Sequence, residues 1–422
     1  MGEALRAYQL ERLKETVDYA RRKSLFYGIH LARFASGPIG DLGDVESLPL
    51  TTADDIRIDP WRFIAVSQDE IARIVTLRTS GTTGDSKRLF FTVDDLEQTI
   101  DFFCHGMSTL VEPGQRVLIF LPGDKPDGVG DLLARGLGRM NAEGIIHGPV
   151  RDVRAAVDDI VRHRIDCLVG IPTQVLGIAR SKAASAIGKG TIKSVLLSTD
   201  YVPAAIAHEL GRTWGCPVYR HYGMTEMGLG GGVECEAHEG YHLREADLYF
   251  EVIDPRTGEP LPDGETGEVV FTTLARKGMP LIRYLTGDMA RFIPGPCPCG
   301  SELRRLGTVR GRRDGRVDLG QGTVLTLPDM DEALFPLPGL LNYEPTLSTR
   351  GAKTCLEIAA FGEGADRPEA EVILKALEKV PAIRNAIAGG YLELSAVRFV
   401  GENWFTTGTA KRGIVDQRHP RG

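Results

Sequence analysis

Several signals are missing from this sequence. None of its apolar runs approaches the ~18 residues that a membrane-spanning helix needs, and residues 1–6 do not begin an apolar signal segment. Internal repeats and low-complexity tracts are also absent. We therefore expect a cytoplasmic protein that has no membrane partner and folds into packed domains.

Cysteine is scarce and positive charge is scattered. Seven cysteines in 422 residues do not make a disulfide framework, and an odd number leaves at least one unpaired. Lys and Arg form no long basic run, and the net charge of −7 with a pI near 5.8 argues against a nucleic-acid partner. The composition, 42% hydrophobic and 25% charged, is that of a globular chain long enough for two or more domains.

The most informative stretch is the polar segment at residues 79–87, which follows an apolar run at residues 71–77. It contains five hydroxyl side chains, two glycines and Lys87. Glycines let backbone N–H groups approach an anion, hydroxyls donate further hydrogen bonds, and the lysine offsets the charge of a polyphosphate. The Walker pattern is absent, because Lys87 comes three positions after the last glycine. An ordinary polar turn has a similar composition, so this segment alone leaves both interpretations open.

Short apolar runs alternate with helix-like segments between residues 116 and 220. The alternation predicts a mostly parallel sheet covered by helices on both faces, with ligands beyond the carboxyl ends of the strands. Residues 198–200 and 222–226 fall at such ends. After Gly232, predicted strands at residues 249–253, 267–272 and 280–284 with turn signals between them indicate an antiparallel β subdomain.

Three further clusters, at residues 222–226, 284–288 and 408–412, have side chains suited to nucleotide chemistry. The ring of Tyr222 could stack on a base and the carboxylate of Glu226 could hold Mg²⁺, although a buried tyrosine beside a surface glutamate is the commoner arrangement. Asp288, in a predicted turn, could accept both hydroxyls of a ribose, or could only cap the backbone. Lys411 could be a cation for a carboxylate or phosphate, or part of a solvated tail.

Four segments, at residues 79–87, 222–226, 286–288 and 311–314, occur in this order over most of the chain. Together they resemble the motifs of the adenylate-forming superfamily, and in particular its phenylacetate–CoA ligase branch. Members of this superfamily join a carboxylic acid to ATP and then usually to coenzyme A.

The resemblance implies an α/β fold with two domains. Residues 1–312 would form a large N-terminal adenylation domain with mostly parallel sheets and a zinc-binding β subdomain. Residues 313–422 would form a small, mobile α+β lid, because a segment rich in glycine and charge at residues 311–315 precedes a final unit of strand and helix patterns. A homodimer is one assembly compatible with the sequence.

The implied activity is ATP-dependent activation of an aryl or other small organic acid to acyl-AMP, followed by thioester formation with coenzyme A. Lys87, Glu226 and Lys411 would be the catalytic residues, with Mg²⁺ near Glu226. The residues implied to contact ATP or AMP are Thr79, Ser80, Gly81, Thr82, Thr83, Gly84, Ser198, Thr199, Asp200, Tyr222, Gly223, Thr225, Asp288 and Arg312. Two other functions stay open: transfer of the acyl or adenylyl group to a carrier protein or cofactor hydroxyl, and nucleotide binding without catalysis.

The chain departs from the family pattern at two places. Residues 198–200 read Ser-Thr-Asp where relatives have a Gly-Ala-Glu type of segment that faces adenine. The family's C-terminal lysine directly follows a glycine, whereas Thr409 follows Gly408 here and Lys411 is the nearest candidate.

The cysteines add a candidate metal site. Cys297 and Cys299 place two thiols on one tight turn, and Cys235 with either His238 or His242 offers a second pair. Four such ligands would close a tetrahedral, structural Zn²⁺ site, as related ligases have, while free thiols in a reducing cytosol are the alternative. We favour His242, because a turn at Gly240 would bring the following strand back beside Cys235.

Overall fold

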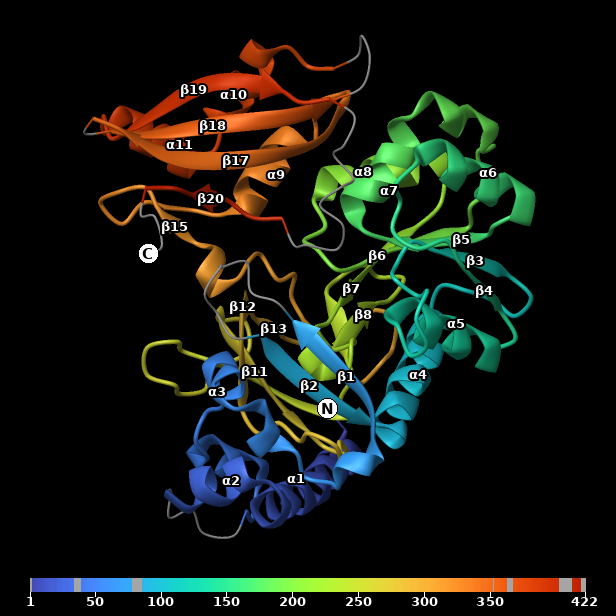
Figure 1. Ribbon diagram of the computed structural model, residues 1–422, viewed down its shortest axis with the longest axis vertical. Helices are drawn as coiled ribbons and strands as arrows, with labels where there is room; N and C mark the ends of the chain where they lie inside the picture. Colours follow the sequence, from blue (N-terminus) through green and yellow to red (C-terminus); the bar gives the residue numbers. More distant parts are fainter. Residues whose placement is uncertain are drawn as a thin grey trace. The chain divides into compact units, whose positions relative to one another are not determined.

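The computed structural model describes residues 2–33, 39–77, 86–351, 353–362, 367–401 and 412–418 (Figure 1). Its internal contacts divide the chain into two compact units. Unit 1 comprises Met1–Leu110, Lys125–Asn141 and His221–Val309, and unit 2 comprises Val111–Asp124, Ala142–Arg220 and Arg310–Gly422. The expected division of the chain at residue 312 stays a prediction. Within the described part, no helix combines the length and apolarity needed to cross a membrane.

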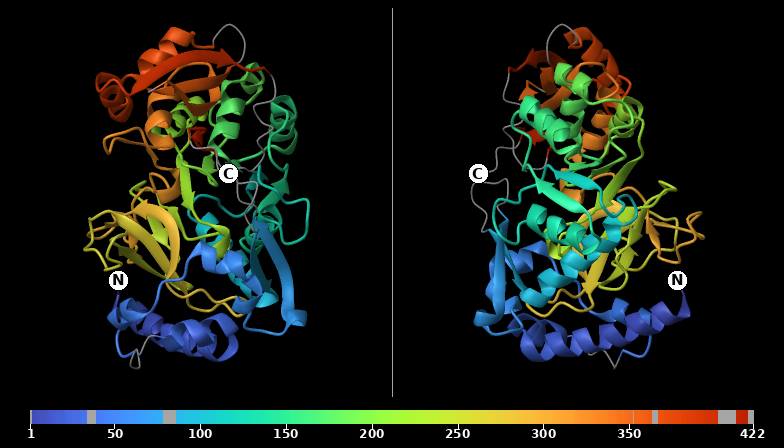
Figure 2. Two further views of the ribbon diagram at one scale, coloured as in Figure 1. Left: turned by 60° about the vertical axis from the view of Figure 1, so that its left-hand side comes forward. Right: turned by 90° about the vertical axis from the view of Figure 1, so that its right-hand side faces the viewer.

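Unit 1 begins with helices that pack against its β-structure. The first of them, α1, runs along the edge of this unit (Figure 2). Thr16 of α1 donates a hydrogen bond to the Leu274 carbonyl oxygen at 2.9 Å, which ties the helix to the end of strand β11. The helices of unit 1 are α1 (Glu3–Lys23), α2 (Leu25–His30), α3 (Ala53–Ile58), α4 (Val93–Met107) and α5 (Val129–Arg139).

Helices α4 and α5 pack closely because a glycine lies at their contact. A Cβ atom at Gly136 would lie 3.0 Å from the Ile100 carbonyl oxygen and 3.0 Å from the Phe103 Cβ. A larger residue there would push the two helices apart. The glycine at this contact therefore has a packing role.

Three sets of strands make up the β-structure of unit 1. Strands β1 (Ile71–Leu77) and β2 (Lys87–Thr92) form an antiparallel hairpin whose register pairs Leu77 with Lys87. A second antiparallel sheet has the order β10–β11–β12. A third runs β13–β14–β9–β8 and continues to residues 221–222 of β7. Their bounds are β7 (Val218–Tyr222), β8 (Gly232–Glu234), β9 (Tyr241–Leu243), β10 (Leu248–Ile253), β11 (Gly267–Thr273), β12 (Tyr284–Ala290), β13 (Phe292–Ile293) and β14 (Arg305–Leu306).

Two sequence predictions in the β subdomain are wrong. Residues 280–283, predicted as strand, are irregular, and the strand β12 begins only at Tyr284. The break falls at Arg283, whose φ of +45° is left-handed and whose guanidinium forms a buried ion pair with Glu251 at 2.8 Å. Asp288 lies within β12 and not in a turn, at an irregularity of the ladder that Gly287 permits with a φ of +77°.

Unit 2 contains the predicted parallel sheet. Its order is β4–β3–β5–β6, continuing to residues 218–220 of β7, and all of these pairs are parallel. The parallel sheet that the alternation between residues 116 and 220 predicts is therefore confirmed. The elements are β3 (Arg116–Ile119), β4 (Glu143–Ile146), α6 (Val153–His163), β5 (Cys167–Gly170), α7 (Pro172–Arg180), β6 (Ser194–Leu197) and α8 (Ala204–Trp214).

The C-terminal part of unit 2 is an α+β arrangement, as expected for residues 313–422. Strands in the order β19–β18–β17–β20 form a mixed sheet, and β15 pairs with β16 as a short hairpin. The elements are β15 (Val317–Asp318), β16 (Val324–Leu325), α9 (Leu327–Leu334), β17 (Leu340–Arg350), β18 (Lys353–Gly362), α10 (Ala370–Leu377), α11 (Pro381–Ala388), β19 (Leu392–Phe399) and β20 (Val415–Asp416).

Arg180 connects the parallel-sheet part of unit 2 with its C-terminal α+β part. From the end of α7, its guanidinium pairs with Glu209 of α8 and donates to the backbone carbonyl oxygens of Phe335 at 2.9 Å and Leu337 at 3.1 Å. These carbonyls follow the C-terminal end of α9, where a positive charge is favoured by the helix dipole. The surrounding apolar side chains of both halves form one continuous buried cluster.

Candidate functional site

A buried polar cluster in unit 1 joins three segments that are far apart in the sequence. The Lys87 ammonium contacts Glu226 Oε1, and the Tyr284 hydroxyl lies 3.1 Å from Lys87 Nζ and 3.2 Å from Glu226 Oε1. Lys87, Glu226 and Tyr284 are 8%, 2% and 1% exposed. A lysine and a glutamate at this depth are rare unless they are paired, so the arrangement is a built site.

Local structure explains how the two charges meet. Lys87 is the last residue of the predicted phosphate segment and the first residue of β2. Glu226 lies in a single 3₁₀ turn, Thr225–Met227, just beyond the end of β7. Gly223 lets the backbone before this turn lie close to the backbone after it, because a Cβ atom at residue 223 would lie 2.5 Å from the Leu229 carbonyl oxygen. The buried Arg276 guanidinium donates to the Glu226 carbonyl oxygen and fixes the backbone of the turn.

The second pair of predicted nucleotide contacts also meets within unit 1. The Tyr222 hydroxyl donates a 2.9 Å hydrogen bond to Asp288 Oδ2. The backbone N–H of Asp288 donates to Thr286 Oγ1 at 3.0 Å, and Thr286 in turn donates to the Val269 carbonyl oxygen at 2.7 Å. Asp288 is 7% exposed, and these bonds fix its backbone from β11 and β12 while Tyr222, at the end of β7, contacts its carboxylate.

A narrow crevice lies beside the Glu226 turn. Strands β1 and β2, helices α4 and α5, and the segment after Thr225 provide its walls. Most of its lining is apolar. The lining residues are Arg73, Val75, Phe91, Leu96, Thr99, Leu132, Thr225, Gly228 and Leu229.

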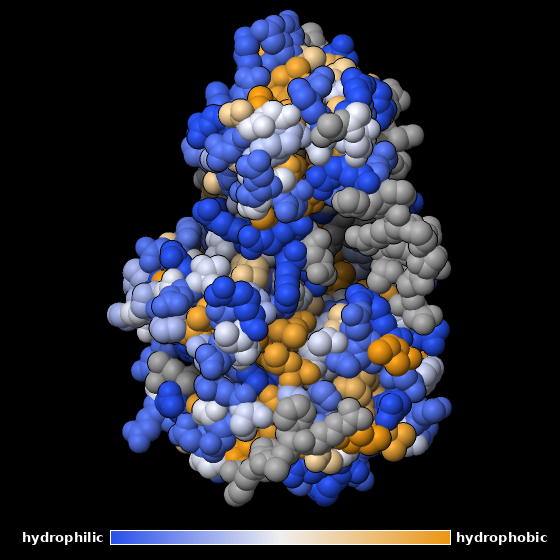
Figure 3. All heavy atoms as spheres, turned by 90° about the vertical axis from the view of Figure 1, so that its left-hand side faces the viewer, coloured by the Kyte–Doolittle hydropathy of each residue, from blue (hydrophilic) through white to orange (hydrophobic). Residues whose placement is uncertain are grey.

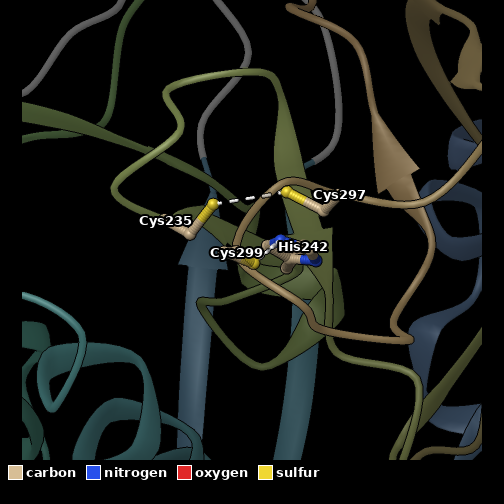
Figure 4. Close-up of side chains that lie close together, drawn as sticks. All are labelled: Cys235, His242, Cys297 and Cys299. Carbon is tan, nitrogen blue, oxygen red and sulfur yellow. Dashed lines mark hydrogen bonds between the residues drawn. The ribbon is translucent and has the colours of Figure 1, made fainter.

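The four predicted metal ligands converge at one point of unit 1 (Figure 4). His242 projects from β9, and Cys297 and Cys299 come from the loop between β13 and β14. One ligand atom of each residue lies within 4.8 Å of the others, with Cys235 Sγ 3.6 Å from Cys297 Sγ and Cys299 Sγ 3.3 Å from His242 Nε2. His238 lies apart from this set, with Nδ1 3.5 Å from Glu234 Oε2. Of the two histidines, His242 is the one that lies with the three cysteines, and its role as a metal ligand stays a prediction.

The spacing of these four atoms suits a tetrahedral cation. Metal–sulfur bonds of about 2.3 Å place two thiolates of a tetrahedral zinc site roughly 3.8 Å apart. The His242 Nδ1 lies 3.2 Å from the Leu303 carbonyl oxygen, which leaves Nε2 facing the cysteines. All seven cysteines of the chain lie in the described part, and none of them is in a disulfide.

The two buried thiols of this cluster differ in their titration. Burial raises the pKa of Cys235 to about 12. For Cys297, burial acts in the same direction, but the hydrogen bond from the Cys299 backbone and those from neighbouring thiols outweigh it and lower the pKa. A bound cation would favour both thiolates.

Four of the predicted nucleotide contacts belong to unit 2. Ser198, Thr199 and Asp200 follow β6 directly, and Thr199 has a left-handed backbone with a φ of +80°. Such a conformation is unfavourable for a β-branched residue and is found mainly at functional turns. The Asp200 carboxylate accepts a 2.9 Å hydrogen bond from the Tyr201 backbone. Arg312 is half-buried and precedes the 3₁₀ turn Arg313–Gly315. Their roles stay predictions.

Other predicted site residues lie outside the described residues. These are Thr79, Ser80, Gly81, Thr82, Thr83 and Gly84 of the phosphate segment and Lys411 near the C-terminus.

Sequence reasoning missed two members of the buried cluster. Tyr284 lies at the end of the predicted strand at residues 280–284, close to the segment at residues 286–288. Its place in a buried strand near Asp288 was a usable signal that it contributes to the site. Arg276 lies in an irregular stretch between β11 and β12, and nothing in the sequence indicates its contact with Glu226.

Comparison with known proteins places these features in context. A family model described as "AMP-binding enzyme" matches residues 59–274, a range that contains Lys87, Tyr222 and Glu226. Phenylacetate-coenzyme A ligase of Pseudomonas putida is 30% identical over 397 residues, which cover 89% of this chain and 87% of the relative. The ligase of the same name from Thermus thermophilus is 28% identical, covering 92% of this chain and 89% of the relative.

Solved structures agree with this fold. A 2-hydroxyisobutyryl-CoA ligase in the postadenylation state, in complex with R3-HIB-AMP, matches with a TM-score of 0.80 at 20% identity, covering 97% of this chain and 89% of that one. The same ligase with 2-HIB-AMP and CoA in the thioesterification state matches with a TM-score of 0.69, covering 99% and 91%. At this identity the likeness concerns the fold.

Proposed function

The chain belongs to the AMP-binding enzyme family, and from this premise we propose that it activates a carboxylic acid with ATP and transfers the acyl group to coenzyme A. The observation that carries the proposal is the match to two phenylacetate-coenzyme A ligases over most of both chains. The acid is an aryl or other small organic acid, in line with the phenylacetate-coenzyme A ligases that this chain resembles.

In the first half-reaction, an oxygen of the acid's carboxylate attacks the α-phosphorus of ATP and pyrophosphate leaves. No proton has to move in this step, so the protein contributes position and charge. Lys87 would bind oxygens of the leaving pyrophosphate, beside the hydroxyls and backbone of residues 79–84. Lys411 would bridge oxygens of the acid and of the nucleotide.

Glu226 fits a magnesium ion in its donor chemistry. Its carboxylate is a hard oxygen ligand and is buried, and Lys87 would have to leave it when the ion binds. When bound, Mg²⁺ would offset charge that develops on the phosphate oxygens. The turn that contains Glu226 is fixed by Arg276, so this carboxylate has a defined position before any ligand arrives.

The nucleoside end of ATP would contact the remaining residues. The Asp288 carboxylate, which accepts from Tyr222 through Oδ2, would bind the ribose hydroxyls. Arg312 would assist there, and the segment of Ser198, Thr199 and Asp200 would face the adenine. Gly223 and Thr225 hold the intervening backbone.

In the second half-reaction, the thiolate of coenzyme A attacks the acyl carbon and AMP leaves. Residues 313–422 would move about Asp314 between the two half-reactions, which removes Lys411 and admits the thiol. Arg180 bears on this movement, because its hydrogen bonds to residues after α9 would have to break or rearrange.

We further propose that Cys235, His242, Cys297 and Cys299 hold a structural Zn²⁺. The proposal rests on the donor set, three thiols and one imidazole nitrogen, and on distances that suit a tetrahedron. All four positions would be filled by protein atoms, so the site would stabilise the β8–β9 and β13–β14 region and take no part in catalysis.

The function is tested by offering the purified protein MgATP and a panel that includes phenylacetate, other aryl acids and small aliphatic acids. We expect pyrophosphate release that depends on one class of acid, and an acyl–CoA product of the matching mass when coenzyme A is added. The K87M variant is the control for contaminating activity. Acid-dependent pyrophosphate release without acyl–CoA would indicate another acceptor, and ATP binding without release for any acid would indicate a non-catalytic relative.

A further inference from the structure

Tyr284 has a position in the buried cluster that the two charged residues alone do not explain. Its hydroxyl is within hydrogen-bond distance of both Lys87 Nζ, at 3.1 Å, and Glu226 Oε1, at 3.2 Å. A phenol can accept from the ammonium and donate to the carboxylate at the same time. Tyr284 is therefore hydrogen-bonded to both members of the ion pair.

The backbone of Tyr284 is fixed from both sides. The Thr51 N–H donates to the Arg283 carbonyl oxygen at 2.9 Å, and the Leu285 N–H donates to the Thr51 carbonyl oxygen at 2.9 Å. Arg283 itself is held by its ion pair with Glu251. The centroid of the tyrosine ring lies 5.5 Å from that of Phe271. This packing limits how far the hydroxyl can move if Lys87 or Glu226 moves.

The proposed function requires the ion pair to open. Lys87 would turn to the phosphates of ATP, and Glu226 would keep a buried carboxylate after its ammonium partner has gone. Removing one partner of a buried ion pair costs about 3–5 kcal/mol when nothing replaces it. Arg276 cannot compensate, because its hydrogen bond goes to the backbone oxygen of Glu226.

We propose that Tyr284 is a positioning residue that keeps the Glu226 carboxylate hydrogen-bonded and oriented while Lys87 moves from it to the polyphosphate. This inference rests on the proposed function. The hydroxyl bonds to Oε1, which leaves Oε2 for the metal ion that accompanies ATP. No proton is transferred, and the residue acts on the reaction only through Glu226 and Lys87.

The test is the Y284F substitution, which removes the hydroxyl and retains the ring that packs on Phe271. A hydrogen bond to a charged group is worth about 1.5–3 kcal/mol, which corresponds to a roughly 10- to 100-fold weaker dissociation constant. We expect a change of this size for ATP in calorimetric titrations with Mg²⁺ and without acid or coenzyme A. The Mg²⁺ concentration for half-maximal ATP binding should rise as well.

The matched control is Y27F. Tyr27 is fully buried, and its hydroxyl bonds to Thr51 Oγ1 at 3.1 Å and to the Ile282 N–H at 2.8 Å, in the same network behind β12. We expect Y27F to lower the urea midpoint without changing the Mg²⁺ dependence. If Y27F and Y284F shift the Mg²⁺ dependence of ATP binding equally, Tyr284 has only a structural role and the proposal is overturned.

A double-substitution cycle supplies the second measurement. If Tyr284 acts through Glu226, Y284F in an E226Q background should change the dissociation constant for ATP less than about twofold. Full additivity of the two substitutions would contradict the proposal. Failure of the wild-type chain to bind MgATP would instead overturn the proposed function, so the two failures are distinguishable.

Discussion

Lys87 and Glu226, 139 positions apart in the sequence, form a buried ion pair. A buried pair contributes little net stability, but removal of one partner leaves an uncompensated charge. We predict that K87M lowers the free energy of unfolding by about 3–5 kcal/mol, and that K87M/E226Q recovers a large part of this loss. Urea unfolding without nucleotide measures both. Wild-type stability for K87M would show that the pair is not closed in the free protein.

Tyr222 and Asp288 provide a prediction about nucleotide recognition. Y222F removes one hydrogen bond to the carboxylate and should raise the dissociation constant for ATP about 2- to 10-fold. D288A should weaken ATP binding more strongly and should also abolish discrimination between ATP and 2′-deoxy-ATP. Retained discrimination in D288A would remove this residue from the ribose site.

The metal cluster predicts about one equivalent of zinc in the freshly purified protein. C299S should retain less than about half an equivalent, because one of four ligands is lost, and should unfold at lower urea concentration. C104S is the matched control, since Cys104 lies on α4 away from the cluster. Metal content below half an equivalent in the wild type would argue for free thiols.

His221 makes stability depend on pH. Burial lowers the pKa of His221 from 6.5 to about 4 in the folded state, so the unfolded chain binds a proton that the folded chain does not between these values. The stability from this residue is therefore complete above pH 6.5 and is lost as pH falls toward 4, by up to roughly 3 kcal/mol. H221Q should weaken the dependence of the urea midpoint on pH over this range. An unchanged pH dependence would contradict this role of His221.

The C-terminal part of unit 2 has a buried ion pair between α9 and the segment before β20, which urea unfolding can also test. Asp331, 1% exposed, accepts hydrogen bonds from Tyr343 at 2.6 Å and from Arg412 at 2.8 Å. R412M should destabilise unit 2 by about 3–5 kcal/mol because it leaves a buried carboxylate without its cation. R418M, which breaks the more exposed pair with Asp416, should cost less than about 1 kcal/mol. Equal effects of the two variants would refute the distinction.

Much of the fold could be predicted because its sequence patterns are local. The strand and helix periods between residues 116 and 220 predicted the parallel sheet, and the spacing of Cys297 and Cys299 with a turn at Gly240 predicted which histidine completes the cluster. The position of Tyr284 could not be predicted in the same way. It depends on contacts with residues 87 and 226, which only the tertiary fold brings together.

The errors have a common physical cause. The predicted strand at residues 280–284 fails at Arg283, where a buried ion pair with Glu251 stabilises a left-handed backbone against its local preference. Asp288 lies in a strand because Gly287 permits an irregular ladder. On the face in Figure 3, the coloured hydrophobic residues appear as separate patches among hydrophilic ones.

The central claim is that the acid is activated as an acyl-adenylate, and an isotope experiment tests it most directly. The accepted acid, labelled with ¹⁸O in its carboxylate, is incubated with MgATP, coenzyme A and the wild-type protein, and the nucleotide product is analysed by mass. Attack of the carboxylate on the α-phosphorus predicts AMP that carries one ¹⁸O atom. Unlabelled AMP, or ADP as the product, would contradict the account.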